Sequence, residues 1–385
     1  MYRCALDGLE PGDLPGRRVG LLTHYAAVTS GLEPAASVLH RLGLLACIFG
    51  PQHGYWGETQ DNMVEWEGYV HPAYDVPVHS LYGRNRAPRP STLSGLDCLA
   101  IDLQDVGARY YTYVYAMALS MRAADRAGLP VVVLDRANPL GLTVLEGGLL
   151  NPEFESYVGM YPLPIRHGLS VGEMALYFAR HDHLETPTVL RAEDPPLSYD
   201  DRLRPWVMPS PNMPALRTTL VYPGACLLEA TNISEGRGTT RPFEIFGAPW
   251  LDGMAMASDL QGTAALRGAV LRPHRFIPTF GKYEGRLCSG AQIHVTDPSS
   301  FRSVRAVSMV LSWCFAHCPE AAWRKPPYEY EEKKTPMDVL AGGSSLRKAV
   351  ESGDAESLTE LTAPPLERYR EDVEGCLLYE RTFKE

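Results

Sequence analysis

The sequence has no apolar run long enough to cross a membrane and no cluster of basic residues. A membrane-spanning helix needs about 18 or more consecutive apolar residues, and none occurs in the 385-residue chain. The formal net charge is -10, whereas nucleic-acid binding depends on Lys and Arg neutralising phosphates. These absences exclude a membrane span and argue against a nucleic-acid partner. The 45% hydrophobic content is typical of a globular protein.

The eight cysteines are too scattered to form the dense framework of a small disulfide-rich protein, so we expect free thiols. Cys314, His317 and Cys318 are close in sequence, but no second ligand pair is evident. Their apolar surroundings favour a packed helix over a metal site. The first residues also lack the basic segment and apolar core of a secretory signal, which predicts a cytoplasmic protein. A periplasmic or exported protein is the alternative.

The length allows two domains, and the patterning predicts an α/β fold. We expect a Rossmann-like parallel-sheet domain over residues 1–205 and a smaller α+β domain over residues 206–385, with the active-site cleft between them. Proline-rich residues 199–214 suggest the boundary. No G-x-G-x-x-G or Walker sequence follows a strand, so no cofactor is predicted. The expected strands lie in residues 17–24, 44–51, 76–83, 96–105, 129–137 and 291–297, and the expected helices in 32–42, 113–127, 171–181, 253–266 and 304–317.

Polar residues gather where the first five strands end. Because the carboxyl ends of parallel strands form one edge of a sheet, ligands commonly bind there. Loops at strand ends are polar in any case, which is the structural explanation. The candidates at this edge are His24, Gln52, His53, Asp105, Arg109, Tyr111 and Asn138.

Two further segments have the composition of a binding site. Residues 49–65 combine glycines and aromatic rings with the polar side chains of Glu58, Asn62 and Glu65, which suits a sugar. Residues 229–244 are densely polar, and arginine can hold a carboxylate through two parallel hydrogen bonds. A purely structural loop is the alternative for each segment. The candidates in the second are Glu229, Asn232, Glu235, Arg237 and Arg241.

Residues 168–172 read Gly-Leu-Ser-Val-Gly and match the G-x-S-x-G pattern of serine hydrolases. Ser170 also stands three residues before Glu173 at the start of a helical run. That spacing is the capping box, in which the two side chains bind backbone N–H groups at the helix end. The pattern therefore favours a helix cap over a nucleophile.

Several long motifs make the chain resemble the NamZ-type exo-β-N-acetylmuramidases, formerly a domain family of unknown function. They include GPQHG, DLQDVGARYYTYVYAM, VVLDRANPLG, LPIRHGLSVGE, PSPNMP and VYPGACLLEATNISEGRGTTRPFEIFGAPW, and the resemblance extends over nearly the whole chain. It implies two domains with a cleft between them. It also implies release of N-acetylmuramic acid from the non-reducing end of peptidoglycan chains, with a carbohydrate or muropeptide as partner.

One position departs from the family pattern. The muramidases typically have a glutamate before His-Gly, where this chain has Gln52, and an amide can act neither as an acid nor as a carboxylate base. The role is therefore moved or lost. Loss would leave a muropeptide-binding protein, and a serine esterase at Ser170 is the most distant alternative. With no metal required, the candidates for catalysis are Gln52, His53, Glu65, Asp105, Glu146 and Glu235, and we expect Arg237 or Arg241 to hold the lactyl carboxylate.

Overall fold

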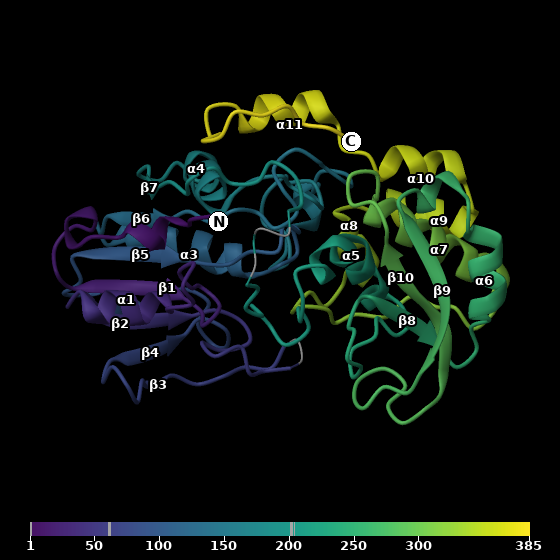
Figure 1. Ribbon diagram of the computed structural model, residues 1–385, viewed down its shortest axis with the longest axis horizontal. Coiled ribbons are helices and arrows are strands. Elements are labelled where there is room, and N and C mark those ends of the chain that lie inside the picture. The colour runs from purple at the N-terminus through teal and green to yellow at the C-terminus, as the bar shows by residue number, and fades with distance from the viewer. Residues whose placement is uncertain (1, 61–62, 201–202, 204) are drawn as a thin grey trace.

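The computed structural model describes residues 2–60, 63–200, 203 and 205–385, and it consists of two halves side by side (Figure 1). The N-terminal half is built on a seven-stranded sheet with the strand order β3-β4-β2-β1-β5-β6-β7, in which β3 alone is antiparallel to its neighbour. The strands are β1 Val19–Thr23, β2 Leu45–Gly50, β3 Tyr69–Val70, β4 Pro77–Ser80, β5 Cys98–Asp102, β6 Val131–Leu134 and β7 Thr188–Leu190.

Adjacent residues of the central strands point into two different hydrophobic cores. Leu21 packs on the side of α1, whereas Leu22 packs on the side of α3 and α4. Because successive side chains of a strand point to opposite faces, a strand covered on both faces is apolar throughout. This explains why all five predicted strands of this half are confirmed. The helices are α1 Ala35–Arg41, α2 Pro90–Leu93, α3 Tyr113–Arg126 and α4 Val171–His181.

The C-terminal half contains a smaller antiparallel sheet with the order β8-β10-β9, packed against helices. The mixed α/β architecture confirms the predicted fold class. The predicted helix over 253–266 is too long, because α6 ends at Leu260 and the chain turns at Gly262, whose φ is 85°. The elements are β8 Ile245–Ala248, β9 Ala269–Phe276, β10 Cys288–Val295, α5 Thr218–Ala225, α6 Gly253–Leu260, α7 Ser303–His317, α8 Pro336–Ala341, α9 Ser345–Ser352, α10 Ala355–Leu361 and α11 Leu366–Val373.

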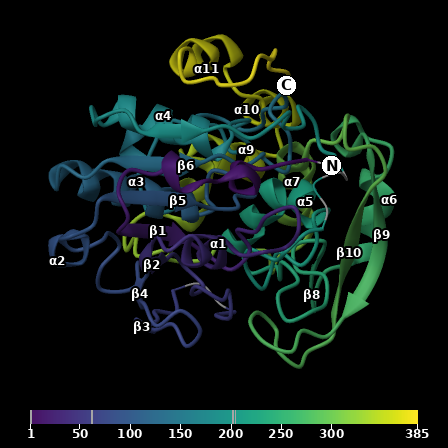
Figure 2. The ribbon, with the colours of Figure 1, turned by 60° about the vertical axis from the view of Figure 1, so that its left-hand side comes forward.

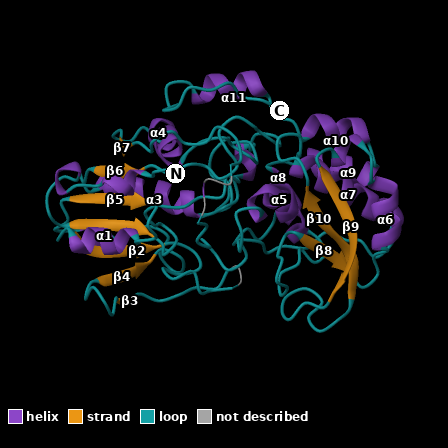
Figure 3. Ribbon diagram, viewed as in Figure 1, coloured by secondary structure: helices purple, strands orange, loops and turns teal. Residues whose placement is uncertain are grey.

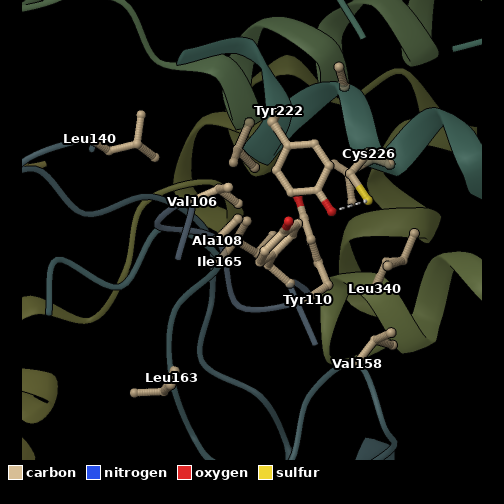
Figure 4. Close-up of a cluster of buried hydrophobic side chains, with 14 of the residues drawn as sticks. Val106, Ala108, Tyr110, Leu140, Val158, Leu163, Ile165, Tyr222, Cys226 and Leu340 are labelled. Atoms are coloured by element: carbon tan, nitrogen blue, oxygen red, sulfur yellow. Dashed lines mark hydrogen bonds between the residues drawn. The ribbon is translucent and has the colours of Figure 1, made fainter. Parts of the chain in front are cut away.

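The two halves share one hydrophobic core. Figure 4 shows Tyr110 and Val158 of the first half beside Tyr222, Cys226 and Leu340 of the second. The Tyr110 hydroxyl also donates a hydrogen bond to the carbonyl of Pro223. Burying a side chain of this size stabilises a fold by about 1.5 to 3 kcal/mol, so these contacts fix the halves against each other.

The end of the chain returns to the N-terminal half. In both Figure 1 and Figure 2, α11 lies beside α4, and the Tyr177 hydroxyl of α4 donates to Asp372 of α11 at 2.5 Å. Beyond α11, the guanidinium of Arg381 binds both carboxylate oxygens of Glu173 at 2.6 and 2.7 Å. A division of the chain at residue 205 stays a prediction.

Within the described residues, none of the helices combines the length and apolar character that crossing a membrane requires. A cytoplasmic location stays a prediction.

Candidate active site between the two halves

A cavity of about 580 Å³ opens in the C-terminal half, and a narrow recess that shares part of its lining lies against the N-terminal half. Figure 3 shows the parallel strands of the large sheet pointing toward the C-terminal half. Residues from both halves line the recess, among them Gln52 and Thr112 from the first half. The residues that line both spaces are Glu229, Arg237, Tyr328 and Glu329.

Gln52 follows β2 and is held at both ends of its amide. Its carbonyl oxygen accepts a hydrogen bond from Thr112, at the start of α3, and its nitrogen donates to the Tyr82 hydroxyl at 3.1 Å. The backbone N–H of Met63 donates to the same hydroxyl. Since Tyr82 accepts these two bonds, its own proton points away from Gln52.

The Tyr82 proton is donated to Glu329, a residue outside the candidates predicted from the sequence. The hydroxyl lies 3.1 Å from the carboxyl oxygen Oε2, and both side chains are buried. Burial, with the charge of Glu229 as a second cause, raises the pKa of Glu329 to about 7. A carboxyl group with this pKa is protonated in about half of the molecules at pH 7 and can donate that proton, as catalytic acids do.

The turn that carries Glu329 has a strained backbone. Glu329 and Tyr330 have φ angles of 46° and 67°, a left-handed region that costs non-glycine residues about 1 to 2 kcal/mol each. Such strain tends to occur at functional sites, where the surrounding structure holds it in place. Here Arg86 lies between two rings, with its guanidinium carbon 3.9 Å from the ring centre of Tyr330 and 4.3 Å from that of Tyr157. Arg86 therefore ties the turn to the N-terminal half.

Glu229 and Glu235 face the same cavity and are paired with cations. Arg237 lies 2.7 Å from one oxygen of Glu229 and 3.5 Å from one of Glu235. Lys282 lies 2.9 Å from the other oxygen of Glu235, and the Tyr328 hydroxyl donates to Glu229 at 2.9 Å. Burial raises the pKa of Glu235, but Lys282 and Arg237 outweigh it and lower that pKa below its ordinary value. The cavity therefore combines Glu329, whose pKa is raised, with Glu235, whose pKa is lowered.

Three other predicted residues reach these spaces. His53 and Tyr111 line the recess, and Asn232 lines the cavity. His53 has a φ of 68°, and its Nδ1 lies 2.7 Å from the carbonyl of Thr59. The Asn232 amide binds the backbone of Glu320 and Ala322, so it also fixes the cavity wall.

Several predicted residues at the strand ends have structural partners instead. Burial lowers the pKa of His24 to about 3, and its neutral Nε2 accepts the N–H of Gln104. Asp105 accepts the N–H of Gly107, and Asn138 binds Leu140 and Leu169. These side chains serve the turns after the strands.

Arg109 and Glu146 connect the two halves. The Arg109 guanidinium donates to the carbonyls of Gly148, Leu163 and Leu340. Glu146 pairs with Arg166 at 3.2 Å and accepts the N–H of Val304 in the first turn of α7. Both side chains are buried away from the cavity lining.

The remaining candidates lie toward the surface. Glu58 and Glu65 are exposed, and Glu65 lines a different recess, of about 710 Å³, along β3 and β4. That recess is larger, but its acids, Glu65 and Glu67, are exposed at the surface. Arg241 pairs with Glu244 and is half exposed outside the cavity lining. Asn62 lies outside the described residues.

Ser170 is a helix cap, which confirms the structural interpretation. It is the N-cap of α4, its side chain accepts the N–H of Glu173, and the Glu173 side chain accepts the N–H of Ser170. Its hydroxyl donates to Asp135. The eight cysteines are free and buried, and α7 confirms the helix predicted around Cys314. Among the residues with described positions, no group of three or more His, Cys, Asp or Glu is arranged to hold a metal ion.

Comparison with known proteins finds one family over most of the chain. Residues 19–217 match the family described as exo-beta-N-acetylmuramidase NamZ, N-terminal, and residues 220–379 match its C-terminal counterpart. The peptidoglycan beta-N-acetylmuramidase NamZ of Bacillus subtilis (strain 168) is 38% identical over 384 residues, covering 97% of this chain and 90% of the relative.

Two solved structures from Bacteroides fragilis NCTC 9343 share the fold, and both are DUF1343 family proteins. One has a TM-score of 0.86 at 26% identity and covers 98% of this chain and 99% of its own. The other has a TM-score of 0.76 at 24% identity and covers 99% of this chain and 100% of its own.

Proposed function

Because this chain belongs to the exo-β-N-acetylmuramidase NamZ family, we propose that it is a glycoside hydrolase that releases β-linked N-acetylmuramic acid from the non-reducing end of peptidoglycan fragments. The observation that carries the proposal is the pairing of Glu329 with Glu229 in one cavity. The pKa of one carboxyl group is raised to about 7, and the other carboxyl group is bound to Arg237.

Glycosidases commonly use such a pair of carboxyl groups. In the proposed reaction Glu329 gives its proton to the glycosidic oxygen as the bond to the anomeric carbon breaks. The negative charge of Glu229 stabilises the positive charge that develops on the sugar. A water oxygen then bonds to the anomeric carbon, and a carboxylate takes up the proton that the water loses. The assignment of these two carboxylate roles to Glu229 and Glu235 belongs to the proposal.

The amide at position 52 fits this scheme. Gln52 orients Tyr82, which in turn binds Glu329, so the amide needs no proton of its own to serve the reaction. The acid is contributed by the C-terminal half instead. The alternative function, binding a muropeptide without cutting it, rests on the same amide. It predicts that the unmodified protein does not hydrolyse the substrate.

The test is hydrolysis of 4-nitrophenyl β-N-acetylmuramide by four proteins: the unmodified chain, Glu329→Gln, Gln52→Glu and Glu332→Gln. We expect turnover by the unmodified chain and by Glu332→Gln, an exposed control from the same segment. Glu329→Gln should be slower than both, and the loss should reach the 100- to 10,000-fold typical of a missing general acid on a disaccharide, whose leaving group needs a proton. Turnover by Gln52→Glu alone would contradict the proposal and favour the binding protein.

A further inference from the structure

The charges around the cavity are unevenly matched. Three basic residues line it, and two of them have carboxylate partners. Arg237 binds Glu229 and Glu235, and Lys282 binds Glu235. The third is Arg324, which forms no ion pair with any residue that the structure describes.

Arg324 has a fixed backbone and an exposed side chain. Its N–H donates to the carbonyl of Ala230 at 2.7 Å, next to the bridge between Thr231 and Trp323. The guanidinium carbon lies 5.7 Å from the ring centre of Tyr328, whose hydroxyl binds Glu229. The ring of Tyr328 therefore lies between the Arg324 guanidinium and Glu229, one of the proposed catalytic carboxyl groups.

The other two arginines of this region are less suited to a ligand. Arg237 is already engaged by two carboxylates, and a substrate would have to compete with them. Arg241 does not line the cavity and pairs with Glu244. Arg324 offers a planar set of donors that match a carboxylate, without displacing a protein partner.

We propose that Arg324 binds the lactyl carboxylate of N-acetylmuramic acid and so distinguishes this sugar from N-acetylglucosamine, which lacks that group. This inference rests on the proposed function, because it names the substrate group that the same cavity recognises. The charges of Arg237 and Lys282 are balanced by the carboxylates with which they pair. Arg324 therefore contributes the positive charge that is left over for a ligand. A lactyl group whose carboxylate is blocked as an amide would lose this interaction.

The test measures binding by calorimetry with three probes: N-acetylmuramic acid, its lactyl methylamide and N-acetylglucosamine. Each is titrated into the unmodified chain, Arg324→Ala, Arg324→Lys and the control Arg241→Ala. We expect Arg324→Ala to weaken binding of N-acetylmuramic acid about 10- to 100-fold, the usual effect of a charge-assisted hydrogen bond. Binding of the other two probes should stay within about twofold, and Arg324→Lys should fall between.

Equal weakening for all three probes, or no weakening for any, would overturn the assignment of Arg324. An equal loss in Arg241→Ala would overturn it as well. Because this readout is binding, it is separate from the turnover assay. A chain that binds N-acetylmuramic acid through Arg324 but never hydrolyses the muramide refutes the proposed function and leaves the assignment standing.

Discussion

The Tyr82 hydroxyl donates a hydrogen bond of 3.1 Å to the Glu329 carboxyl group, and the two residues are 247 positions apart in the chain. The bond spans the boundary between the halves. The proposed acid is thus oriented by the N-terminal sheet although the C-terminal half carries it. The chemistry of the site depends on how the halves meet.

The role of Glu329 as an acid predicts a dependence on the leaving group. A nitrophenolate leaves readily without a proton, whereas a sugar hydroxyl requires one. Glu329→Gln should therefore lose more activity on a disaccharide than on 4-nitrophenyl β-N-acetylmuramide, by about 10-fold or more within the range typical of general acids. Steady-state rates on the two substrates measure it, and equal losses would remove Glu329 from the acid role.

The pH dependence of hydrolysis should report the same group. Activity requires protonated Glu329, so the rate should fall as the pH rises through about 7. The hydrogen bond from Tyr82 lowers the pKa of Glu329, so Tyr82→Phe should move this decline to higher pH. Tyr157→Phe is the matched control, since its buried hydroxyl has no hydrogen-bond partner within the described part of the chain. If neither variant changes the pH at which the rate declines, the assignment of Glu329 as the acid is contradicted.

Glu329 should also make stability depend on pH. Its pKa is raised from 4.5 to about 7 in the folded state, so the folded protein binds this proton more tightly than the unfolded chain does. The resulting stabilisation is present below pH 4.5 and is lost as the pH rises toward 7. Glu329→Gln removes the effect. Between pH 4 and pH 8, we expect the free energy of unfolding of the variant to rise by on the order of 3 kcal/mol relative to that of the unmodified chain.

Urea unfolding of the two proteins at both pH values measures this difference. Glu332→Gln is again the control, because Glu332 is exposed. A difference that does not change with pH would mean that Glu329 is ionised in the folded state at neutral pH, and the proposed acid would be lost.

Arg86 should act on the reaction through the position of Glu329. Arg86→Ala removes the contact with Tyr330, and a cation over an aromatic ring contributes about 0.5 to 2 kcal/mol. We expect kcat to fall roughly 10-fold with KM little changed. The alkaline decline should also move to higher pH, because the charge of Arg86 lowers the pKa of Glu329. Arg86→Lys should restore part of both effects, and Arg84→Ala, at an exposed neighbour, should leave them unchanged. A normal pH profile in Arg86→Ala would limit Arg86 to a structural role.

Ser170→Ala should lower stability without changing the reaction. The loss of an N-cap side chain costs about 0.5 to 2 kcal/mol, and Ser170 also binds Asp135. Thermal unfolding measures the cost, and Ser170→Thr, which keeps a capping hydroxyl, should recover most of it. A loss of turnover with unchanged stability would revive the serine as a nucleophile.

The sequence was most informative where a local pattern determines the structure. Leu21 and Leu22 belong to an apolar strand between two layers, and Ser170 with Glu173 marks the start of a helix. In contrast, the local sequence does not distinguish Glu329 from Glu331 and Glu332. Only burial separates them, and burial is produced by packing against residues that are distant in the chain.

The acids at the strand ends show the converse problem. Asp105 and Asp135 follow strands in the manner of catalytic residues, but each has a carboxylate oxygen that accepts a backbone hydrogen bond. Asp135 accepts from Gly172, Ser170 and Tyr379. The sequence indicates that a polar group lies at the edge of the sheet, but not which partner will reach it.

The return of the chain end has a consequence for how the protein forms during synthesis. Asp135 receives the hydroxyl of Tyr379, 244 residues later, and Glu173 receives the guanidinium of Arg381, 208 residues later. A ribosome completes the parallel sheet long before it makes these partners, and a buried carboxylate without its partner is costly. The first half therefore reaches its final stability only after nearly all of this sequence has been translated.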